Sequence, residues 1–336
     1  MSTQDRIRLM LWNLERDGGP EPRPGVLPAR WRQGYEEVLK PQRPDWLAML
    51  ELKYSQTRPD VPPAEKHAAK RRFTAAQQIL GMRGFRAAVG QRTNPTGVFI
   101  REAVFPSARQ RHHPVGHSAP PTHVDLRLAE APDVPIITAS FHSAFCNPAQ
   151  RRSEAMDLTE LVDKVKAHHP NPAGGHAACW LFGDTNEYPV PVGEQVPAID
   201  WSRVTDVVHR RHRAIKQPDG TWVSCTAVDE IMHDCGMHDP ARWAAHRLGQ
   251  TTALAATAGH AAAGQGGPRR IDRGYLDAWS VQAVEDVRVL DTTGLSDHHA
   301  VIVDLSRRKL IEGLHRRTSA IAPWSLVVER ARNTHT

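Results

Sequence analysis

Apolar residues fall into seven short runs along the chain, each five to eight residues long. The runs cover Ile7–Asn13, Asp45–Leu52, Thr96–Ile100, Thr122–Leu128, Val134–Phe141, Ala177–Phe182 and Ala300–Leu305. Runs of this length, unbroken or alternating with polar residues, are typical of β-strands that are buried on one or both faces. We therefore predict seven strands, spread over almost the whole chain.

Three other stretches repeat apolar side chains every three or four residues, which predicts helices. They cover Trp31–Leu39, Ala155–Val165 and Val228–Cys235. Two further stretches show neither pattern: Ala108–Pro121 is polar, and Ala241–Gly267 is rich in alanine and glycine. We expect both to be loops.

The strand pattern crosses the 336-residue chain without a composition break that would mark a second domain. A single core can serve about 250–300 residues. We therefore predict one domain over residues 1–310, with an insertion at about 187–268. Residues 311–336 are expected to form a C-terminal extension.

Several predicted strands have at one end a polar side chain that can bind a metal ion or a phosphate. These side chains belong to Asn13, Glu51, His142, Asp184 with Asn186, and Asp297 with His298. Strand ends that lie side by side in a sheet bring such groups to one rim. A rigid scaffold with polar groups at its rim is a common way to build a site.

The residue types in this set suit the hydrolysis of a phosphoester. A hard cation such as Mg²⁺ prefers carboxylate ligands and neutralises charge that develops on a phosphoryl oxygen. A carboxylate can orient or deprotonate a water molecule, and a histidine can stabilise the transition state or protonate the leaving oxygen. The set contains each of these groups.

Taken singly, each residue also has a purely structural interpretation. Glu51 suits an edge strand or a buried ion pair, and the Gly-Asp-Thr-Asn sequence at 183–186 suits an ordinary turn. His298 suits an exposed surface. Only the order of these residues along the chain favours a shared site.

Charge adds to this picture without deciding the ligand. Lysine and arginine number 43 against 37 acidic residues, and the pI is about 9.3. Most of the positive charge is arginine, whose guanidinium forms bidentate hydrogen bonds with phosphate oxygens. The excess of six charges does not by itself establish nucleic-acid binding.

The four cysteines show no CxxC spacing, so we expect reduced thiols. Residues 1–13 lack the apolar segment of a signal peptide, and no apolar run reaches about 18 residues. These features predict a soluble, cytoplasmic protein without a transmembrane segment. No obligate protein partner is evident.

Six motifs in a fixed order resemble those of the endonuclease/exonuclease/phosphatase superfamily. They are Trp12-Asn13-Leu14, Glu51, Ser140-Phe141-His142-Ser143-Ala144, Gly183-Asp184-Thr185-Asn186, Arg270-Ile271-Asp272 and Gly294-Leu295-Ser296-Asp297-His298. Each motif is short, but their order, spacing and placement after strands make the joint match specific. The resemblance covers about residues 6–306. It implies an α+β fold with four layers, α/β/β/α, in which two mostly antiparallel sheets pack face to face and helices flank them.

The resemblance also implies a metal site and a catalytic pair. Glu51 is expected to be the principal carboxylate ligand of Mg²⁺ or Mn²⁺, with Asn13 close to the metal or the phosphate. Asp297 is expected to reach the metal. His298 is expected to act on the phosphate and to be oriented by Asp272, since a carboxylate holds an imidazole in one tautomer.

Three more residues complete the catalytic set that the resemblance implies. Asp184 is expected to position or activate the attacking water, and Asn186 to steady the phosphate and the water. His142 resembles the histidine of deoxyribonucleases and sphingomyelinases that is proposed to act as a general acid for the leaving group.

The sequence departs from the family pattern in three places. Leu50 stands where the family often has Gln before its metal glutamate. Arg273 and Gly274 follow Asp272, where an apolar or aromatic residue is usual. The interval from 187 to 269 is long. No catalytic group is lost, but these departures leave the branch of the family open.

The leading prediction is a Mg²⁺-dependent hydrolase, a nuclease that cleaves phosphodiesters of DNA or RNA. The basic run that contains Arg210, Arg211 and Arg213 is expected to bind the phosphates of the substrate. Two alternatives stay open. One is a phosphatase or phosphodiesterase for a small, sugar or lipid-derived phosphate, and the other is an inactive binding protein on the same scaffold.

Overall fold

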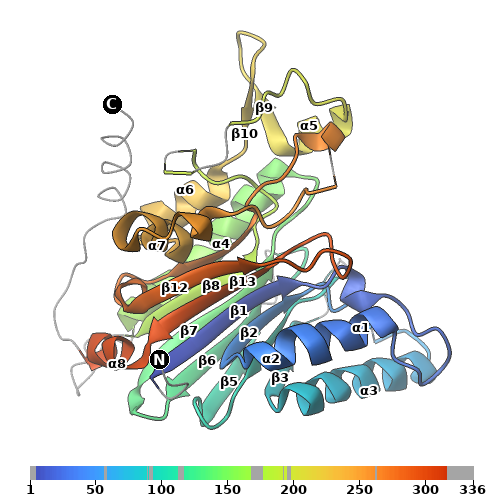
Figure 1. Ribbon diagram of the computed structural model, residues 1–336, viewed down its shortest axis with the longest axis vertical. Coiled ribbons are helices and arrows are strands. Elements are labelled where there is room, and N and C mark those ends of the chain that lie inside the picture. The colour runs from blue at the N-terminus through green and yellow to red at the C-terminus, as the bar shows by residue number, and fades with distance from the viewer. Residues whose placement is uncertain are drawn as a thin grey trace.

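Two β-sheets pack face to face between layers of helices (Figure 1). This computed structural model describes residues 5–56, 59–88, 90, 94–112, 117–167, 177–191, 193–194, 198–261 and 263–315. All seven predicted strands are present within these ranges.

The first sheet has six strands in the order β12, β13, β1, β2, β4, β3. Their bounds are β1 (Arg6–Asn13), β2 (Trp46–Leu50), β3 (Arg83–Arg86), β4 (Gly97–Ile100), β12 (Val284–Leu290) and β13 (Ala300–Ser306). β1 and β2 run parallel, and all other neighbours are antiparallel. The first and last strands of the chain, β1 and β13, thus pair in the middle of one sheet.

The second sheet has five strands in the order β11, β8, β7, β6, β5. Their bounds are β5 (Ser107–Arg111), β6 (Thr122–Leu128), β7 (Ala131–His142), β8 (Ala178–Asp184) and β11 (Asp272–Leu276). Only β7 and β8 run parallel. Each sheet therefore has a single parallel pair, which confirms the prediction of two mostly antiparallel sheets.

Strand alternation divides the side chains of β1 between two buried faces. Ile7, Leu9 and Leu11 point into the core between the sheets, whereas Met10 and Trp12 point toward the outer helices. Burial on both faces explains why this run is almost wholly apolar.

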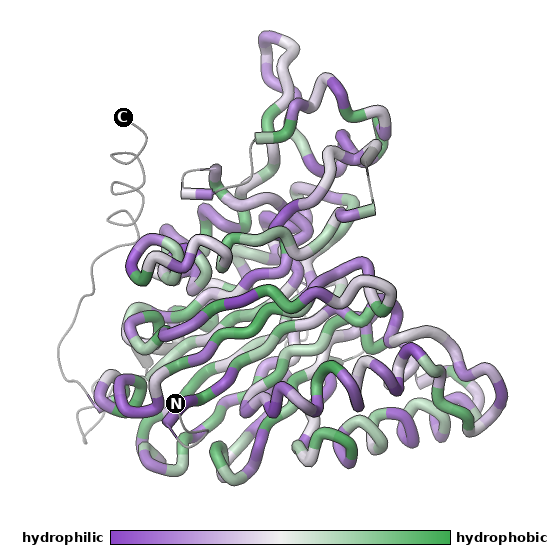
Figure 2. Tube along the Cα trace, viewed as in Figure 1, coloured by the Kyte–Doolittle hydropathy of each residue, from purple (hydrophilic) through white to green (hydrophobic). Residues whose placement is uncertain are grey.

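Helices cover the outer face of each sheet. The first sheet carries α1 (Ala29–Gln33), the π-helix η2 (Gly34–Leu39), α2 (Lys40–Gln42) and α3 (Pro63–Leu80), and the second carries α4 (Pro148–Ala167) and α6 (Ala227–Asp234). The three predicted helices are present, and the four-layer sandwich is confirmed. In Figure 2 hydrophobic and hydrophilic residues alternate along the outer helices α1 and α3, as expected for helices with one buried face.

The described residues also include four short 3₁₀ helices. They are η1 (Arg16–Gly18), η3 (Thr251–Leu254), η4 (Ala263–Gln265) and η5 (Val281–Ala283).

The stretch Ala108–Pro121 was expected to be a loop, and its first part is instead strand β5. This strand lies at the edge of the second sheet, and none of its residues is fully buried. An edge strand without a buried face has no apolar periodicity, so the sequence pattern could not reveal it.

The interval 187–268 contains a small unit of its own. α5 (Val207–Arg213), β9 (Ala214–Lys216) and β10 (Trp222–Ser224) rise beyond the sandwich in Figure 1. A separate apolar cluster that includes Tyr188 and Trp201 holds this unit together. The predicted insertion is therefore a compact subdomain in its first part.

The second part of the interval belongs to the sandwich, and the expected loop at Ala241–Gly267 is wrong for its first residues. α7 (Pro240–Leu248) places Ala241, Ala244 and Ala245 in the core between the sheets. The helix begins at Asp239, whose carboxylate accepts the Ala241 N–H at 2.8 Å. Alanine is strongly helix-forming but weakly hydrophobic, so this helix lacks a visible apolar stripe.

α8 (Arg307–His315) crosses the predicted boundary at residue 310, and its Leu310 and Leu314 are buried in the main core. Residues 316–336 lie outside the described ranges, so a C-terminal extension stays a prediction there. Within the described residues, no helix combines the length and the apolar character needed to cross a bilayer.

The position of Arg273 and Gly274 on strand β11 explains why these two residues follow Asp272. Gly274 faces the core between the sheets, where a Cβ atom would lie 2.5 Å from the ring of Phe182 on the neighbouring strand β8. Arg273 faces the opposite way and is wholly buried, with Nη1 2.7 Å from Oδ1 of Asp229 on α6. Burial alone would raise the pKa of Asp229, but the charges of Arg242 and Arg273 hold it well below its ordinary value.

We expect Arg273→Met to destabilise the fold by about 3–5 kcal/mol, because it leaves the Asp229 charge buried with one cation fewer. Urea denaturation at neutral pH, where Asp229 is ionised, measures the loss. Arg308→Met is the matched control, since Arg308 makes an exposed pair with Glu312 and should cost less than about 1 kcal/mol. Equal effects of the two substitutions would contradict a structural role for the buried pair.

Candidate active site

The candidate site lies where the core between the sheets ends at one rim. Side chains alternate along a strand, so every second residue faces the core between the sheets. Four polar residues continue this inward face at the ends of their strands: Asn13 of β1, His142 of β7, Asp184 of β8 and Asp272 of β11. The apolar pattern of the strands therefore aims all four toward the same space.

The register of the second sheet places three of these residues in one row. His142 lies opposite Asp184 in the parallel pair, and Asp272 lies opposite Asp184 in the antiparallel pair. Neighbouring strands are about 4.8 Å apart, so such side chains can touch. His142 Nε2 lies 3.5 Å from Oδ2 of Asp184.

The Gly183–Asn186 segment is both a close strand contact and a turn. A Cβ atom at Gly183 would lie 2.1 Å from the carbonyl oxygen of Phe141, so only glycine lets β7 and β8 approach here. Asp184 then accepts the Asn186 N–H at 2.7 Å, and Asn186 has a φ of 49°. Asn tolerates this left-handed conformation better than most residues, which accounts for the motif.

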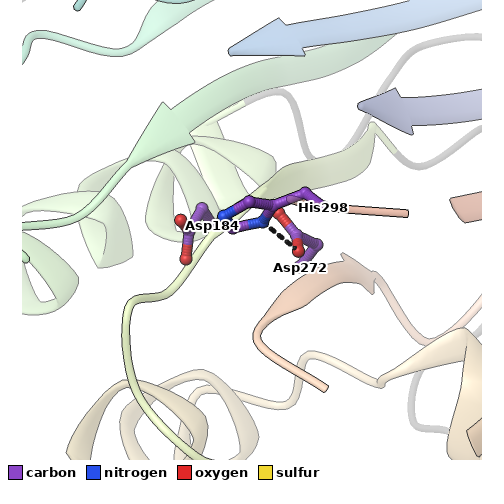
Figure 3. Close-up of side chains that lie close together, drawn as sticks. All are labelled: Asp184, Asp272 and His298. Atoms are coloured by element: carbon purple, nitrogen blue, oxygen red, sulfur yellow. Dashed lines mark hydrogen bonds and ion pairs between the residues drawn. The ribbon is translucent and has the colours of Figure 1, made fainter. Parts of the chain in front are cut away.

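His298 and Asp272 form a buried hydrogen-bonded pair beside Asp184 (Figure 3). His298 Nδ1 and Asp272 Oδ2 lie 2.7 Å apart, and the two side chains are 11% and 0% exposed. Burial by itself would lower the pKa of His298, but the charge and hydrogen bond of Asp272, together with the charge of Asp184, raise it to about 10. His298 is therefore a cation at neutral pH.

Buried hydrogen bonds fix both members of this pair. The Asp272 N–H donates to Oγ1 of Thr257 at 3.0 Å. The His298 N–H donates to Oγ of Ser296 at 3.1 Å, and this hydroxyl donates to the carbonyl oxygen of Asn13 at 2.6 Å. The segment before β13 is thereby tied to the end of β1 in the first sheet, and the bond between His298 and Asp272 joins it to β11 of the second sheet.

Glu51 directly follows β2 and lies beside Asn13. Its carboxylate accepts the Arg16 N–H at 2.8 Å and faces Nδ2 of Asn13 at 3.4 Å. Oδ1 of Asn13 is buried and has no hydrogen-bond partner among the described residues. A carboxylate next to an unpartnered buried amide oxygen suits a hard cation, so these two residues fit the predicted Mg²⁺.

A second group of possible ligands is the cluster of Asp184, Asp272 and His298, whose ligand atoms lie within 4.8 Å of one another. His298 Nδ1 already bonds Asp272, and a protonated imidazole repels a cation. This cluster therefore suits proton transfer and charge stabilisation better than metal binding. Asp297, the third predicted metal ligand, is 62% exposed at the rim.

Comparison with known proteins rests on the fold. No protein-family model matches the chain, and no curated protein matches it in sequence. A 3′-5′ exonuclease from Neisseria meningitidis has a TM-score of 0.54 at 18% identity, over 89% of this chain and 100% of its own. An AP endonuclease from Leishmania major gives 0.59 at 14% identity, over 91% and 90%. A 3′ phosphatase from Neisseria, bound to a product DNA hairpin, gives 0.52 at 16% identity, over 89% and 99%.

The chain has the endonuclease/exonuclease/phosphatase fold. The resemblance read from its six motifs is thus confirmed for the architecture. At these identities the activity has to be argued from the site itself.

A buried ion pair holds the loop beside Glu51, and the sequence did not predict it. Residues 15–17 all have positive φ, between 23° and 55°. The Asp17 carboxylate accepts the Ser55 hydroxyl at 2.8 Å and lies 3.7 Å from Nε of Arg72. Burial raises the pKa of Asp17 to about 6, against the opposing effects of Arg72 and Ser55. These partners are far apart in the chain, so no local pattern could have identified them.

A second buried pair supports the other half of the site and was also missed. Nε of Arg151 lies 3.1 Å from the Glu187 carboxylate, and its Nη1 donates to the Ala144 carbonyl oxygen at 2.9 Å. Both charged side chains are almost completely buried. Glu187 also accepts the Val228 N–H at 2.7 Å, so this pair links the turns after β7 and β8 to helix α6.

The three arginines predicted to bind substrate lie on α5 in different surroundings. Arg213 donates to the carbonyl oxygen of Asn186 and, from Nη2, to its Oδ1 at 2.7 Å. Arg210 lies over the ring of Trp222, with 5.3 Å to the centroid, and Arg211 is exposed. Arg213 thus holds the turn at Gly183–Asn186, and substrate binding by the basic run stays a prediction.

We expect Asp272→Asn to lower the pKa of His298 from about 10 toward its ordinary value of 6.5, because the amide removes the main stabilising charge. NMR titration of the His298 ring measures this shift. Turnover should fall by roughly 10²–10⁴-fold, since the amide can hold the wrong tautomer.

Asp291→Asn is the matched control, because Asp291 lies 3.5 Å from the neighbouring His299. It should leave the pKa of His298 in place. An unshifted His298 in Asp272→Asn would show that the pair does not control this histidine.

We expect Glu51→Gln to weaken Mg²⁺ or Mn²⁺ binding at least about tenfold, because the amide keeps the shape but loses the charge. Calorimetric titration with Mn²⁺ measures this directly. Glu102→Gln is the control, since Glu102 is exposed and pairs with Arg83. The same affinity in both variants would remove Glu51 from the metal site.

Proposed function

We propose that this protein is a divalent-metal-dependent phosphoester hydrolase that cleaves phosphodiester bonds of a nucleic acid. The observation that carries the proposal is the cationic His298, held by Asp272 next to the Asp184 carboxylate. A fixed cation and a carboxylate beside one cavity supply the charge stabilisation and the base that phosphoester hydrolysis requires.

Each residue has a defined task in this proposal. Asp184 orients the attacking water and accepts its proton, and Asn186, fixed by Arg213, holds the water or a phosphoryl oxygen. His298 donates a hydrogen bond from Nε2 to the phosphoryl group, where negative charge accumulates. His142 protonates the leaving oxygen.

Glu51 and Asn13 would hold Mg²⁺, which supplies Lewis-acid stabilisation of the phosphoryl oxygens. Mn²⁺ satisfies the same oxygen ligands. A preference for Mg²⁺ and a cytoplasmic location remain predictions from the sequence.

Two features support a nucleic acid as the substrate. Arg213 and Arg269 line the cavity that opens beside His298, and a 3′ phosphatase with this fold binds a DNA hairpin. The cavity measures 480 Å³, a size that also suits a compact phosphate ester. A phosphatase for a small substrate is therefore the second candidate, whereas an inactive binding protein would not need the complete set of catalytic groups.

We expect the protein to cleave DNA or RNA oligonucleotides in the presence of Mg²⁺ or Mn²⁺, and EDTA to stop the reaction. Asp184→Asn should lower the rate by roughly 10²–10⁴-fold, since the base for the water is lost. Gel analysis of labelled oligonucleotides measures this, with Asp219→Asn as control because Asp219 only caps an exposed turn through Thr221. Full activity of Asp184→Asn would sink the proposal.

Salt dependence separates the two candidate substrates. Several phosphate contacts release condensed counterions, so polynucleotide affinity should fall by roughly a hundredfold between about 50 and 200 mM salt. Hydrolysis of bis-p-nitrophenyl phosphate over the same range should change little. A flat response with the polynucleotide would favour the small-substrate phosphatase.

A further inference from the structure

A second cavity adjoins the one beside His298. The first has a volume of 480 Å³ and the second 380 Å³. Tyr188 and Arg269 line both, so these two side chains form the wall between them. Both volumes fall within the range of about 300–1,000 Å³ that is typical of ligand sites.

The first cavity suits a phosphate group. Arg213 and Arg269 line it and bring two permanent positive charges to it. Arg269 bonds backbone carbonyl oxygens, and its Nη1 donates to that of Pro268 at 2.6 Å. In the described part of the chain Arg269 forms no ion pair with a carboxylate, so its charge is available to an anion.

The second cavity suits a flat aromatic ring. Trp201 and Trp222 line it together with Tyr188. The rings of Tyr188 and Trp201 pack against each other, 5.7 Å apart and tilted by 58°, and form one aromatic wall. Trp201 is 3% exposed and is fixed by a 3.0 Å hydrogen bond from its Nε1 to Oγ of Ser224. Trp222 is only partly buried and is held by the Arg210 cation over its ring. Rigid aromatic walls of this kind bind nucleobases of any sequence by stacking.

Tyr188 connects the two compartments. Its hydroxyl lies 3.2 Å from Nε2 of His209 in the first cavity, while its ring packs beside Trp201 in the second. Burial, with a smaller contribution from Arg213, lowers the pKa of His209 to about 4, so this histidine is neutral at physiological pH. Its ring nitrogen can therefore share a hydrogen bond with Tyr188 or with a sugar hydroxyl.

We propose that the two cavities together bind one unpaired nucleotide, with its phosphate at Arg213 and Arg269 and its base against the aromatic side chains of the second cavity. The inference rests on the proposed function, because it places the scissile phosphate beside His298. A nucleotide within a duplex keeps its base stacked and paired and cannot enter the second cavity without first unpairing. The protein is therefore expected to prefer unpaired strands or frayed ends over fully paired duplex.

Binding is tested without turnover, in EDTA, by calorimetry with deoxyadenosine monophosphate, deoxyribose 5-phosphate and deoxyadenosine. The mononucleotide should bind at least about fivefold more tightly than the sugar phosphate, the gain expected from stacking one base. Trp222→Ala should abolish this gain, and Trp222→Phe should retain most of it. Equal affinity for the mononucleotide and the sugar phosphate would overturn the proposal.

The phosphate compartment has its own test. Arg269→Gln should weaken both phosphorylated ligands but leave deoxyadenosine unchanged, because only a phosphate contact is lost. Arg247→Gln is the matched control, since Arg247 lies over the ring of Trp243 and lines neither cavity. Equal losses in the two variants would contradict a phosphate site at Arg269. Thermal denaturation of each variant confirms that it is folded.

Competition separates a strand from a free nucleotide as the natural ligand. A single-stranded oligonucleotide should displace the mononucleotide, whereas a fully paired hairpin without an overhang should not. Displacement by both to the same extent would overturn the unpaired-nucleotide inference. Since these measurements exclude metal, they can fail while Mg²⁺-dependent cleavage persists, and absent cleavage with intact nucleotide binding would instead reject the proposed hydrolase.

Discussion

The position of every candidate catalytic group depends on the register of β8 between β7 and β11. This register sets His142 and Asp272 on either side of Asp184, and Gly183 permits it by leaving room for the Phe141 carbonyl oxygen. Strand alternation turns every second side chain inward. These inward side chains are apolar within the sandwich and polar at the rim. A slip by one residue would turn these side chains to the outer face.

Buried arginines hold the loops around this rim. Arg151 pairs with Glu187, Arg72 with Asp17 and Arg273 with Asp229, and each pair joins segments that are distant in the sequence. Such pairs contribute little net stability, but breaking one leaves an uncompensated charge. A considerable part of the arginine content therefore serves internal structure, which is why the net charge of +6 is a poor guide to the substrate.

The fold is shared with an exonuclease, a phosphatase and an AP endonuclease at 18% identity or less, so the common architecture does not select among these reactions. Selectivity has to come from segments added to the sandwich. In this chain the small unit around Tyr188 and Trp201 stands beside the catalytic rim and forms one side of both cavities.

The sequence by itself determined seven of the strands, three helices and the polar residues at the strand ends, because alternation and helical spacing are local properties. It did not reveal β5, which has no buried face, or α7, whose alanines carry little hydrophobic signal. It placed Arg213 among the substrate contacts but could not show that this side chain also bonds Asn186. Only the tertiary structure decided which charges pair internally and which line the cavities, since those contacts join residues tens to hundreds of positions apart.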